Sequence, residues 1–140
     1  MEKIIDEYKI GHDIIGAAFT VRRNTGRGML EKFYEKALMY ELQKLHYDVK
    51  SQVAIPAIYC GEVISEAYRA DIVVEDKVII ELKAISSMDD IESCQLYTYL
   101  KLSGYKLGYL INFGARDFSI GSLHDGAPFD KGIYRLANKL

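Results

Sequence analysis

The sequence predicts one domain of the α/β (α+β) class, with a mixed sheet flanked by helices. Residues 10–23 and 29–45 carry apolar side chains at spacings of three and four, as amphipathic helices do. Residues 49–85 form runs rich in valine and isoleucine between turn residues, which is typical of antiparallel strands. A helical segment and one more apolar run follow, so the last strand returns through a helical crossover, as a parallel neighbour does.

Composition limits the class of protein. With 140 residues, 49% hydrophobic and 27% charged, the chain suits a single domain over residues 1–140. It has no run of roughly 18 apolar residues that would span a membrane and no readable secretory signal, so we expect a soluble, cytoplasmic protein. Its two cysteines are expected to be reduced, and a net charge of −2 neither favours nor excludes nucleic acid.

The first two helices are separated by a turn. Residues 24–28 (NTGRG) contain two glycines, which favour a break over a continued helix. The next helix is expected to begin at Met29. Its apolar stripe includes Tyr34, and Glu31 lies three residues before Tyr34 on the same face. We therefore expect Glu31 to border the buried side.

Three sequential antiparallel strands are expected at 49–59, 63–74 and 77–85. Cys60 and Gly61 separate the first two strands. Residues 75–77 separate the second from the third.

The last part of the chain is expected to supply a helix and a strand. Ser87 offers an N-cap for a helix over 89–103, which Gly104 would end as the residue after its last turn. A fourth strand is expected at 106–113. The short apolar pieces after Gly114 fit an edge strand and a loop.

Two charged residues interrupt the apolar run at 78–84. Because side chains alternate across a strand, Glu81 and Lys83 share one face and the neighbouring apolar residues share the other. Burying a charge costs several kcal/mol unless the charge is paired or bound to a metal. This arrangement therefore indicates a functional reason for the two charges.

The preceding strand, residues 63–74, alternates in the same way. Ala70, Ile72 and Val74 are expected to share its apolar face. Asp71 is then expected on the opposite face.

The turn between these strands sets their register. If residues 75–77 form a three-residue loop, Asp71 lies directly opposite Glu81. Opposed Cβ atoms are roughly 4.5–5.5 Å apart, and like charges there repel unless a cation lies between them. Both carboxylates, the Leu82 backbone carbonyl and waters would suit Mg²⁺ or Mn²⁺. Lys83 would then hold the attacking water or stabilise charge on phosphorus.

The same spacing has a second interpretation. Asp71, Glu81 and Lys83 would also form a structural ion-pair ladder on a solvent-facing surface. Similarly, Arg22, Arg23 and Arg27 would either touch phosphates or belong to a solvated loop.

Three segments, GMLEKFYEKAL, YRADIVVEDKVIIELKAI and QLYTYL, together resemble the GxxExxY family of the PD-(D/E)xK nuclease superfamily. The resemblance covers residues 14–113 and implies a restriction-endonuclease-like αβββαβ core. The matched positions are Gly28, Glu31 and Tyr34 of the naming motif, and Asp71, Glu81 and Lys83 of the aspartate and E-x-K motif. Residues 21–28 depart from the family, because they lack the His and Pro-Gly that related sequences often show.

The resemblance implies a role for each matched residue. Glu31 would orient the metal or its waters, Asp71 and Glu81 would ligate it, and Lys83 would assist the nucleophile. Gln95 and Tyr99 match a Q-x-x-x-Y pattern that supports the site and contacts nucleic acid. The expected substrate contacts are Arg27, Tyr34 and Tyr99.

We therefore expect an Mg²⁺- or Mn²⁺-dependent phosphodiesterase that hydrolyses DNA, in which metal and Lys83 stabilise the transition state. One alternative is a catalytically inactive nuclease-like module that binds nucleic acid or a protein partner. Another is the same chemistry on RNA or a nucleotide. No membrane partner is expected, and a homodimer is possible because the chain offers little surface for holding a duplex.

Overall fold

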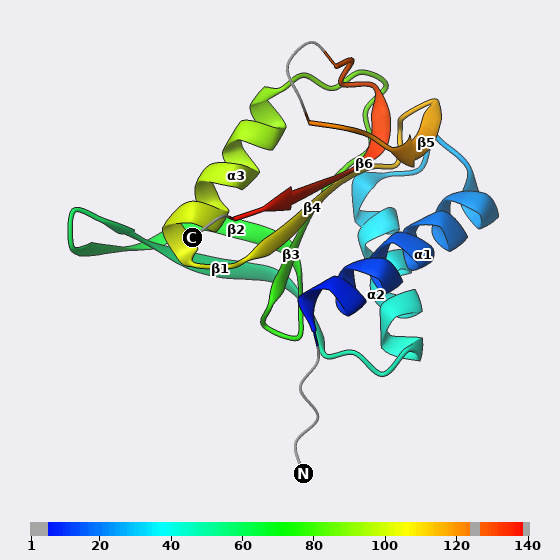
Figure 1. The fold of residues 1–140 in the computed structure, drawn as a ribbon. Coiled ribbons are helices and arrows are strands. Elements are labelled where there is room, and N and C mark those ends of the chain that lie inside the picture. Colours follow the sequence, from blue (N-terminus) through cyan, green and yellow to red (C-terminus); the bar gives the residue numbers. More distant parts are fainter. Residues whose placement is uncertain (1–5, 124–126, 139–140) are drawn as a thin grey trace.

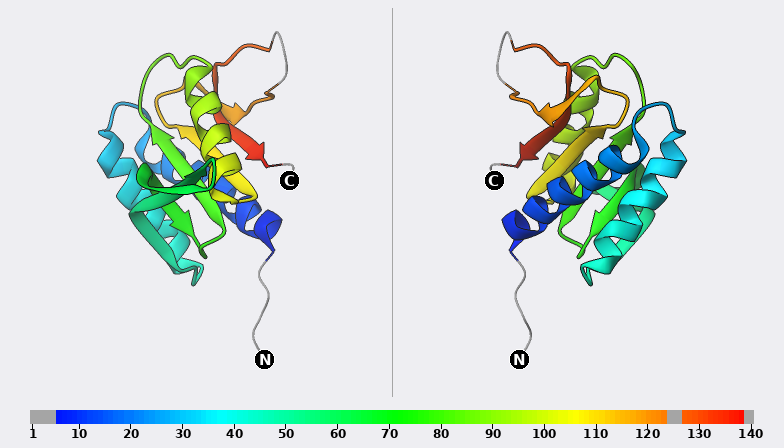
Figure 2. Two further views of the ribbon diagram at one scale, coloured as in Figure 1. Left: turned by 90° about the vertical axis from the view of Figure 1, so that its left-hand side faces the viewer. Right: turned by 90° about the vertical axis from the view of Figure 1, so that its right-hand side faces the viewer.

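One mixed sheet separates two layers of helix (Figures 1 and 2). The computed structural model describes residues 6–123 and 127–138, without the side chains of residues 65–67. Within that description, α1 (Glu7–Thr25) and α2 (Glu31–Lys44) pack on one face of the sheet, and α3 (Ile91–Ser103) packs on the other. Each face therefore has its own apolar core, as the amphipathic pattern predicts.

The sheet contains six described strands in the order β1-β2-β3-β4-β6-β5. β3 and β4 are parallel, as are β5 and β6, and the other neighbours are antiparallel. The strands are β1 (Val49–Tyr59), β2 (Glu62–Val74), β3 (Val78–Lys83), β4 (Leu107–Asn112), β5 (Asp117–Ile120) and β6 (Lys131–Ala137). The predicted parallel pairing of the third and fourth strands is confirmed.

The break between α1 and α2 occurs where the sequence predicts it. α1 begins after Asp6, whose carboxylate accepts a hydrogen bond from the Tyr8 amide, and ends at Gly26, which has φ +72°. That left-handed conformation favours glycine. α2 starts two residues later than predicted, so Glu31 occupies its first position.

The turn between β2 and β3 has the predicted register. Val74 pairs with Val78, and Ile72 pairs with Ile80. The Lys77 amide donates to the Val74 carbonyl and closes the three-residue loop. The register argument that brings the second and third strands together is confirmed.

The predicted alternation of β2 is wrong at one residue. Ala70 packs in the core beneath α3, whereas Ile72 packs in the core beneath α1 and α2. The residues paired between β1 and β2 skip Gln52 and Asp71, and Gln52 has φ +52°. The regular side-chain alternation is therefore reset at these two positions.

Two predictions for the later elements also need correction. Ser87 does not cap α3: the helix begins after Asp90, and the Asp89 carboxylate accepts from the Ile91 amide. The predicted end at Gly104 is confirmed, with φ +83°. The tail supplies two strands, and only β5 lies at the edge, because β6 inserts between β4 and β5.

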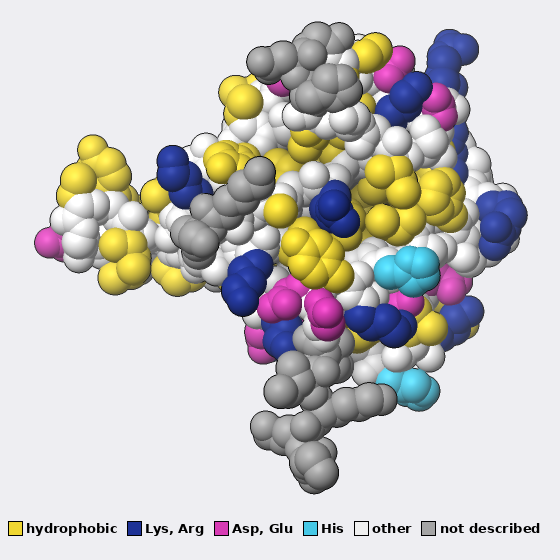
Figure 3. All heavy atoms as spheres, in the orientation of Figure 1, with side chains coloured by type: hydrophobic (Ala, Val, Ile, Leu, Met, Phe, Trp, Pro, Cys, Tyr) yellow, Lys and Arg dark blue, Asp and Glu magenta, His cyan; other side chains and the backbone are white. Residues whose placement is uncertain are grey.

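The β1–β2 hairpin extends beyond the rest of the sheet (Figure 1). Apolar side chains cover its end (Figure 3), and the most exposed are Ile58, Tyr59, Val63 and Ile64. Such a patch on a small protein is typical of an interaction surface.

Candidate active site

The site lies at a fork between β2 and β3. Their ladder ends at the pair Ile72 and Ile80, immediately before Asp71 and Glu81. Beyond that point side chains replace backbone partners: the Leu82 amide donates to Asp71 Oδ2 at 2.8 Å, and the Asp71 amide approaches Glu81 Oε1 at 3.3 Å. The fork therefore holds two acidic side chains next to each other.

Glu81 is in an environment that opposes its ionisation. It is largely buried, and its burial and the nearby Asp71 carboxylate raise its pKa to about 7. The Tyr68 hydroxyl, the Asp71 amide and Lys83 act in the opposite direction but do not cancel the effect. The protein by itself leaves this carboxylate without full charge compensation.

Tyr68 and Tyr99 form one wall beside Glu81. Their rings stack at a centroid separation of 3.8 Å with planes 10° apart. The Tyr68 hydroxyl approaches Glu81 closely enough to influence its pKa, although their geometry falls short of a regular hydrogen bond. Burial and the Glu81 charge raise the pKa of Tyr68, so it stays a neutral donor. Tyr99 is thus linked to the site through Tyr68.

Glu31 and Lys83 complete the charged group. Glu31 is exposed at the first position of α2, and loss of hydration together with the Asp71 charge raises its pKa. Lys83 is half-buried at the end of β3 and opposes the pKa increases of both Glu31 and Glu81. Glu31, which is distant in sequence, therefore interacts electrostatically with Asp71 and Lys83, next to Glu81.

Two polar residues that sequence analysis missed also border the site. Gln52 Nε2 donates to Glu35 at 3.2 Å and to Asp71 Oδ1 at 3.3 Å. Burial is the largest cause of a raised pKa of Glu35. The hydrogen bond from Gln52 opposes this increase, and the Asp71 charge adds to it. Glu35 follows Glu31 by one helical turn, a spacing that would have been a usable signal. No sequence pattern indicated Gln52, because only its unusual backbone conformation directs its side chain toward Asp71.

Three predicted residues make no hydrogen bond or ion pair with the charged group in the described part of the chain. Tyr34 is fully buried, which argues against the substrate contact predicted for it: its hydroxyl donates to the Gly26 carbonyl and accepts from the Met29 amide. Arg27 is exposed and its Nε donates to the Gly114 carbonyl at 2.9 Å. Gln95 is exposed on α3, and its side chain makes no hydrogen bond to a described residue.

The donor set fits a hard divalent cation that keeps several waters. Within residues 6–123 and 127–138, no three His, Cys, Asp or Glu side chains are grouped closely enough to hold a metal alone. Asp71 and Glu81 nevertheless supply two carboxylates whose repulsion a cation would relieve. Because N–H and C=O of a strand residue point to the same side, the Leu82 carbonyl also faces the fork. Mg²⁺ is commonly held by one or two carboxylates and waters.

Fold and site together define a nuclease-like α+β protein with a restriction-endonuclease-like core. The family model for the PD-(D/E)XK nuclease superfamily matches residues 8–121, and the chain belongs to this superfamily. Its nucleases generally use divalent metal ions and act on nucleic acid. Comparisons with curated proteins and with solved structures give no match. None of the described helices is both long enough and apolar enough to cross a bilayer.

Proposed function

We propose that the protein is an Mg²⁺- or Mn²⁺-dependent nuclease that hydrolyses phosphodiester bonds in DNA, of the GxxExxY type. The observation that carries this proposal is the fork, where Asp71 and Glu81 meet without an ion pair to any described residue and Lys83 offsets their charge only in part. Opposed carboxylates destabilise a sheet, so their presence is explained by a function that needs them.

Each side chain has a role in this proposal. Asp71, Glu81 and the Leu82 carbonyl hold the metal, which when bound supplies a Lewis acid and an activated water. Hydrogen bonds from the Leu82 amide and Gln52 fix the orientation of the Asp71 carboxylate. Lys83 stabilises negative charge that develops on the phosphoryl oxygens.

Glu31 and the residues of α3 have supporting roles. Glu31 accepts hydrogen bonds from waters of the metal, and Glu35 extends this acidic edge through Gln52. Tyr99 positions Tyr68 by stacking, and Tyr68 orients Glu81. Gln95, which is exposed one helical turn before Tyr99, contacts the nucleic acid.

The test is incubation of the pure protein with single- and double-stranded DNA and RNA in Mg²⁺, Mn²⁺ or EDTA. We expect cleavage of DNA in either metal and none in EDTA. Cleavage of RNA but not of DNA would indicate a ribonuclease. Binding without cleavage in any metal would favour the inactive nuclease-like module instead. The Glu81→Gln variant is the control for contamination, because cleavage by a contaminating nuclease would be the same in this variant as in the parent protein.

Self-association is part of the proposal, with the end of the β1–β2 hairpin as the contact. The patch of Ile58, Tyr59, Val63 and Ile64 carries no basic side chain, so it suits a protein surface better than a nucleic acid. We expect a mass of two chains by light scattering. A double replacement, Ile58→Ser with Val63→Ser, should return the mass to one chain, because these residues form one exposed cross-strand pair.

A further inference from the structure

A column of stacked rings supports an arginine on the outside of α1. Tyr34 stacks on Phe113 at 4.5 Å, and Phe113 stacks on Phe118 at 5.3 Å. The Arg22 guanidinium lies over the Phe118 ring, 5.0 Å from its centroid. The ring contact is a cation–π interaction, which holds the guanidinium in place without accepting a hydrogen bond from any of its N–H groups.

No described residue accepts a hydrogen bond from this guanidinium. Arg22 Nη1 is buried and has no hydrogen-bond partner in the described part of the chain. Arg22 also forms no ion pair there. A partly buried cation that lacks an anion is costly, and unsatisfied groups of this kind often mark a missing ion or ligand.

A second arginine is fixed nearby without a carboxylate. Arg27 is anchored only through Nε to the Gly114 carbonyl, which leaves its terminal nitrogens free of protein partners among the described residues. Gly114 follows Phe113 of the stacked column. Burial is the main cause of a lowered pKa of Arg22, and the Arg27 charge adds to the shift, as expected for two close cations.

This pair of arginines lies at the same end of the sheet as the catalytic lysine of the proposed function. The Phe113 amide donates to the Lys83 carbonyl at 2.9 Å, and the next residue, Gly114, accepts from Arg27. Two consecutive residues therefore join Lys83 to Arg27.

We infer that Arg22 and Arg27 form a phosphate-binding subsite that holds the nucleic-acid backbone one or more phosphates away from the scissile bond. The subsite rests on the proposed function for the identity of its ligand. Guanidinium groups bind phosphate oxygens in pairs, and no carboxylate among the described residues forms an ion pair with either arginine. The subsite takes a phosphodiester within a strand or a terminal phosphate, which share the same chemistry.

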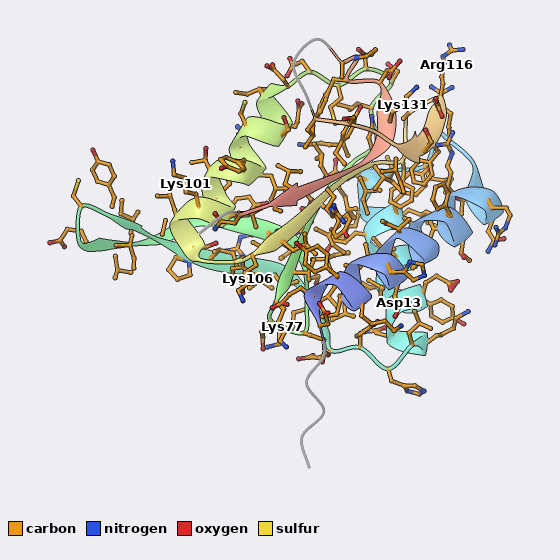
Figure 4. The ribbon with its side chains drawn as sticks, in the orientation of Figure 1. Asp13, Lys77, Lys101, Lys106, Arg116 and Lys131 are labelled. Atoms are coloured by element: carbon orange, nitrogen blue, oxygen red, sulfur yellow. The ribbon has the colours of Figure 1, made fainter. Side chains whose placement is uncertain are left out.

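The experiment measures binding of a fluorescent 12-nucleotide DNA strand in EDTA, across a range of salt concentrations. EDTA removes the metal, so binding is measured independently of cleavage. The test variant is Arg22→Met with Arg27→Met, because methionine keeps the packing of the stem over Phe118. The matched control is Lys101→Met with Lys106→Met, two exposed lysines at the end of the sheet away from Arg116 and the turn after β4 (Figure 4). Melting temperatures verify folding, and Arg22→Lys with Arg27→Lys serves as a second variant that keeps both charges.

We expect the double methionine variant to bind about tenfold more weakly for each arginine, as loss of a charge-assisted hydrogen bond gives. Its salt dependence, the slope of log K against log salt, should be less steep by about 0.7 for each lost contact with a single strand. The lysine variant should retain the slope but lose affinity, because it loses paired recognition. The control should match the parent. A strand with uncharged methylphosphonate linkages should reduce the slope of the parent without any mutation.

A change of strand end separates the two sources of phosphate. If a 5′-hydroxyl strand and a 5′-phosphate strand show the same arginine effect, the ligand is an internal phosphodiester; an effect confined to the 5′-phosphate strand identifies a terminal phosphate. Equal binding by parent and double methionine variant, an equal loss in the control, or no binding by the parent would each overturn the subsite. An arginine-dependent affinity in a protein that cleaves no substrate would preserve the subsite and reject the nuclease proposal.

Discussion

The Leu82 amide donates to the Asp71 carboxylate at 2.8 Å, across the point where the ladder between β2 and β3 ends. In a continuous ladder this amide would bond a backbone carbonyl of β2. Here the Asp71 carboxylate takes the place of that carbonyl, so the amide has a hydrogen-bond acceptor although the two strands separate. This hydrogen bond also fixes Asp71 next to Glu81, and several testable consequences depend on that placement.

Replacement of Glu81 by glutamine should abolish metal-dependent cleavage and raise the melting temperature of the metal-free protein at pH 8. Glutamine keeps an oxygen that accepts from the Asp71 amide but removes the repulsion between the two carboxylates. Thermal denaturation in EDTA measures the stability, and a DNA cleavage assay measures the activity. Glu62→Gln, at the exposed hairpin end, should change neither. A lower melting temperature for Glu81→Gln would contradict the repulsion.

The pKa of Glu81 predicts how metal-free stability depends on pH. Its pKa is about 7 in the folded protein against 4.5 in a flexible chain, so between these values the folded state holds a proton that the unfolded state has lost. Stability from this group is therefore full below pH 4.5, decreases up to pH 7 and is constant above, with a total change on the order of 3 kcal/mol.

Denaturant titrations from pH 4.5 to 8 check this dependence as the difference between the parent and Glu81→Gln, because other groups cancel in the difference. Mg²⁺ should remove the decline, since it binds the ionised carboxylate. A pH-independent difference in EDTA would show that Glu81 ionises normally.

Replacement of Lys83 by alanine should separate metal binding from catalysis. The proposed ligands remain, so Mg²⁺ should still raise the melting temperature. Cleavage should fall by about 10²–10³, the usual cost of losing one electrostatic contact to a transition state. Loss of the metal-induced shift together with activity would indicate that Lys83 organises the ligands instead.

Gly114 should be irreplaceable for a steric reason. A Cβ at this position would lie 2.4 Å from the Ile85 carbonyl oxygen and 2.6 Å from the Ile85 nitrogen, and both are backbone atoms that cannot rotate away. Gly114→Ala should therefore destabilise the protein by about 1–3 kcal/mol, as overpacking does. Gly16→Ala is the matched control: it meets no atom within 4 Å on an exposed helix position and should stabilise by roughly 0.5–1 kcal/mol. Urea denaturation of both variants gives the comparison.

The buried hydroxyl of Tyr34 should matter for stability. Tyr34→Phe removes the hydrogen bonds to Gly26 and Met29 and should cost about 1–3 kcal/mol, because two backbone groups lose a partner. The exposed Tyr40, replaced by phenylalanine, should show almost no change. A large loss of substrate affinity at unchanged stability would restore the predicted substrate contact.

The sequence by itself determined the element order, the turn between β2 and β3 and the sharing of one face by Glu81 and Lys83. Those features follow from local rules: helical and strand periods, and a loop length that fixes which residues oppose each other. Only the tertiary structure decided that Gln52 bonds Asp71, that Ala70 faces the α3 core and that Tyr34 is buried. It also decided that Arg22 lies on a column of rings drawn from three separate segments. These features arise from packing between segments, and no periodicity within one segment encodes them. They include a left-handed residue inside a strand, the insertion of β6 beside β4 and the stacking of distant aromatic rings.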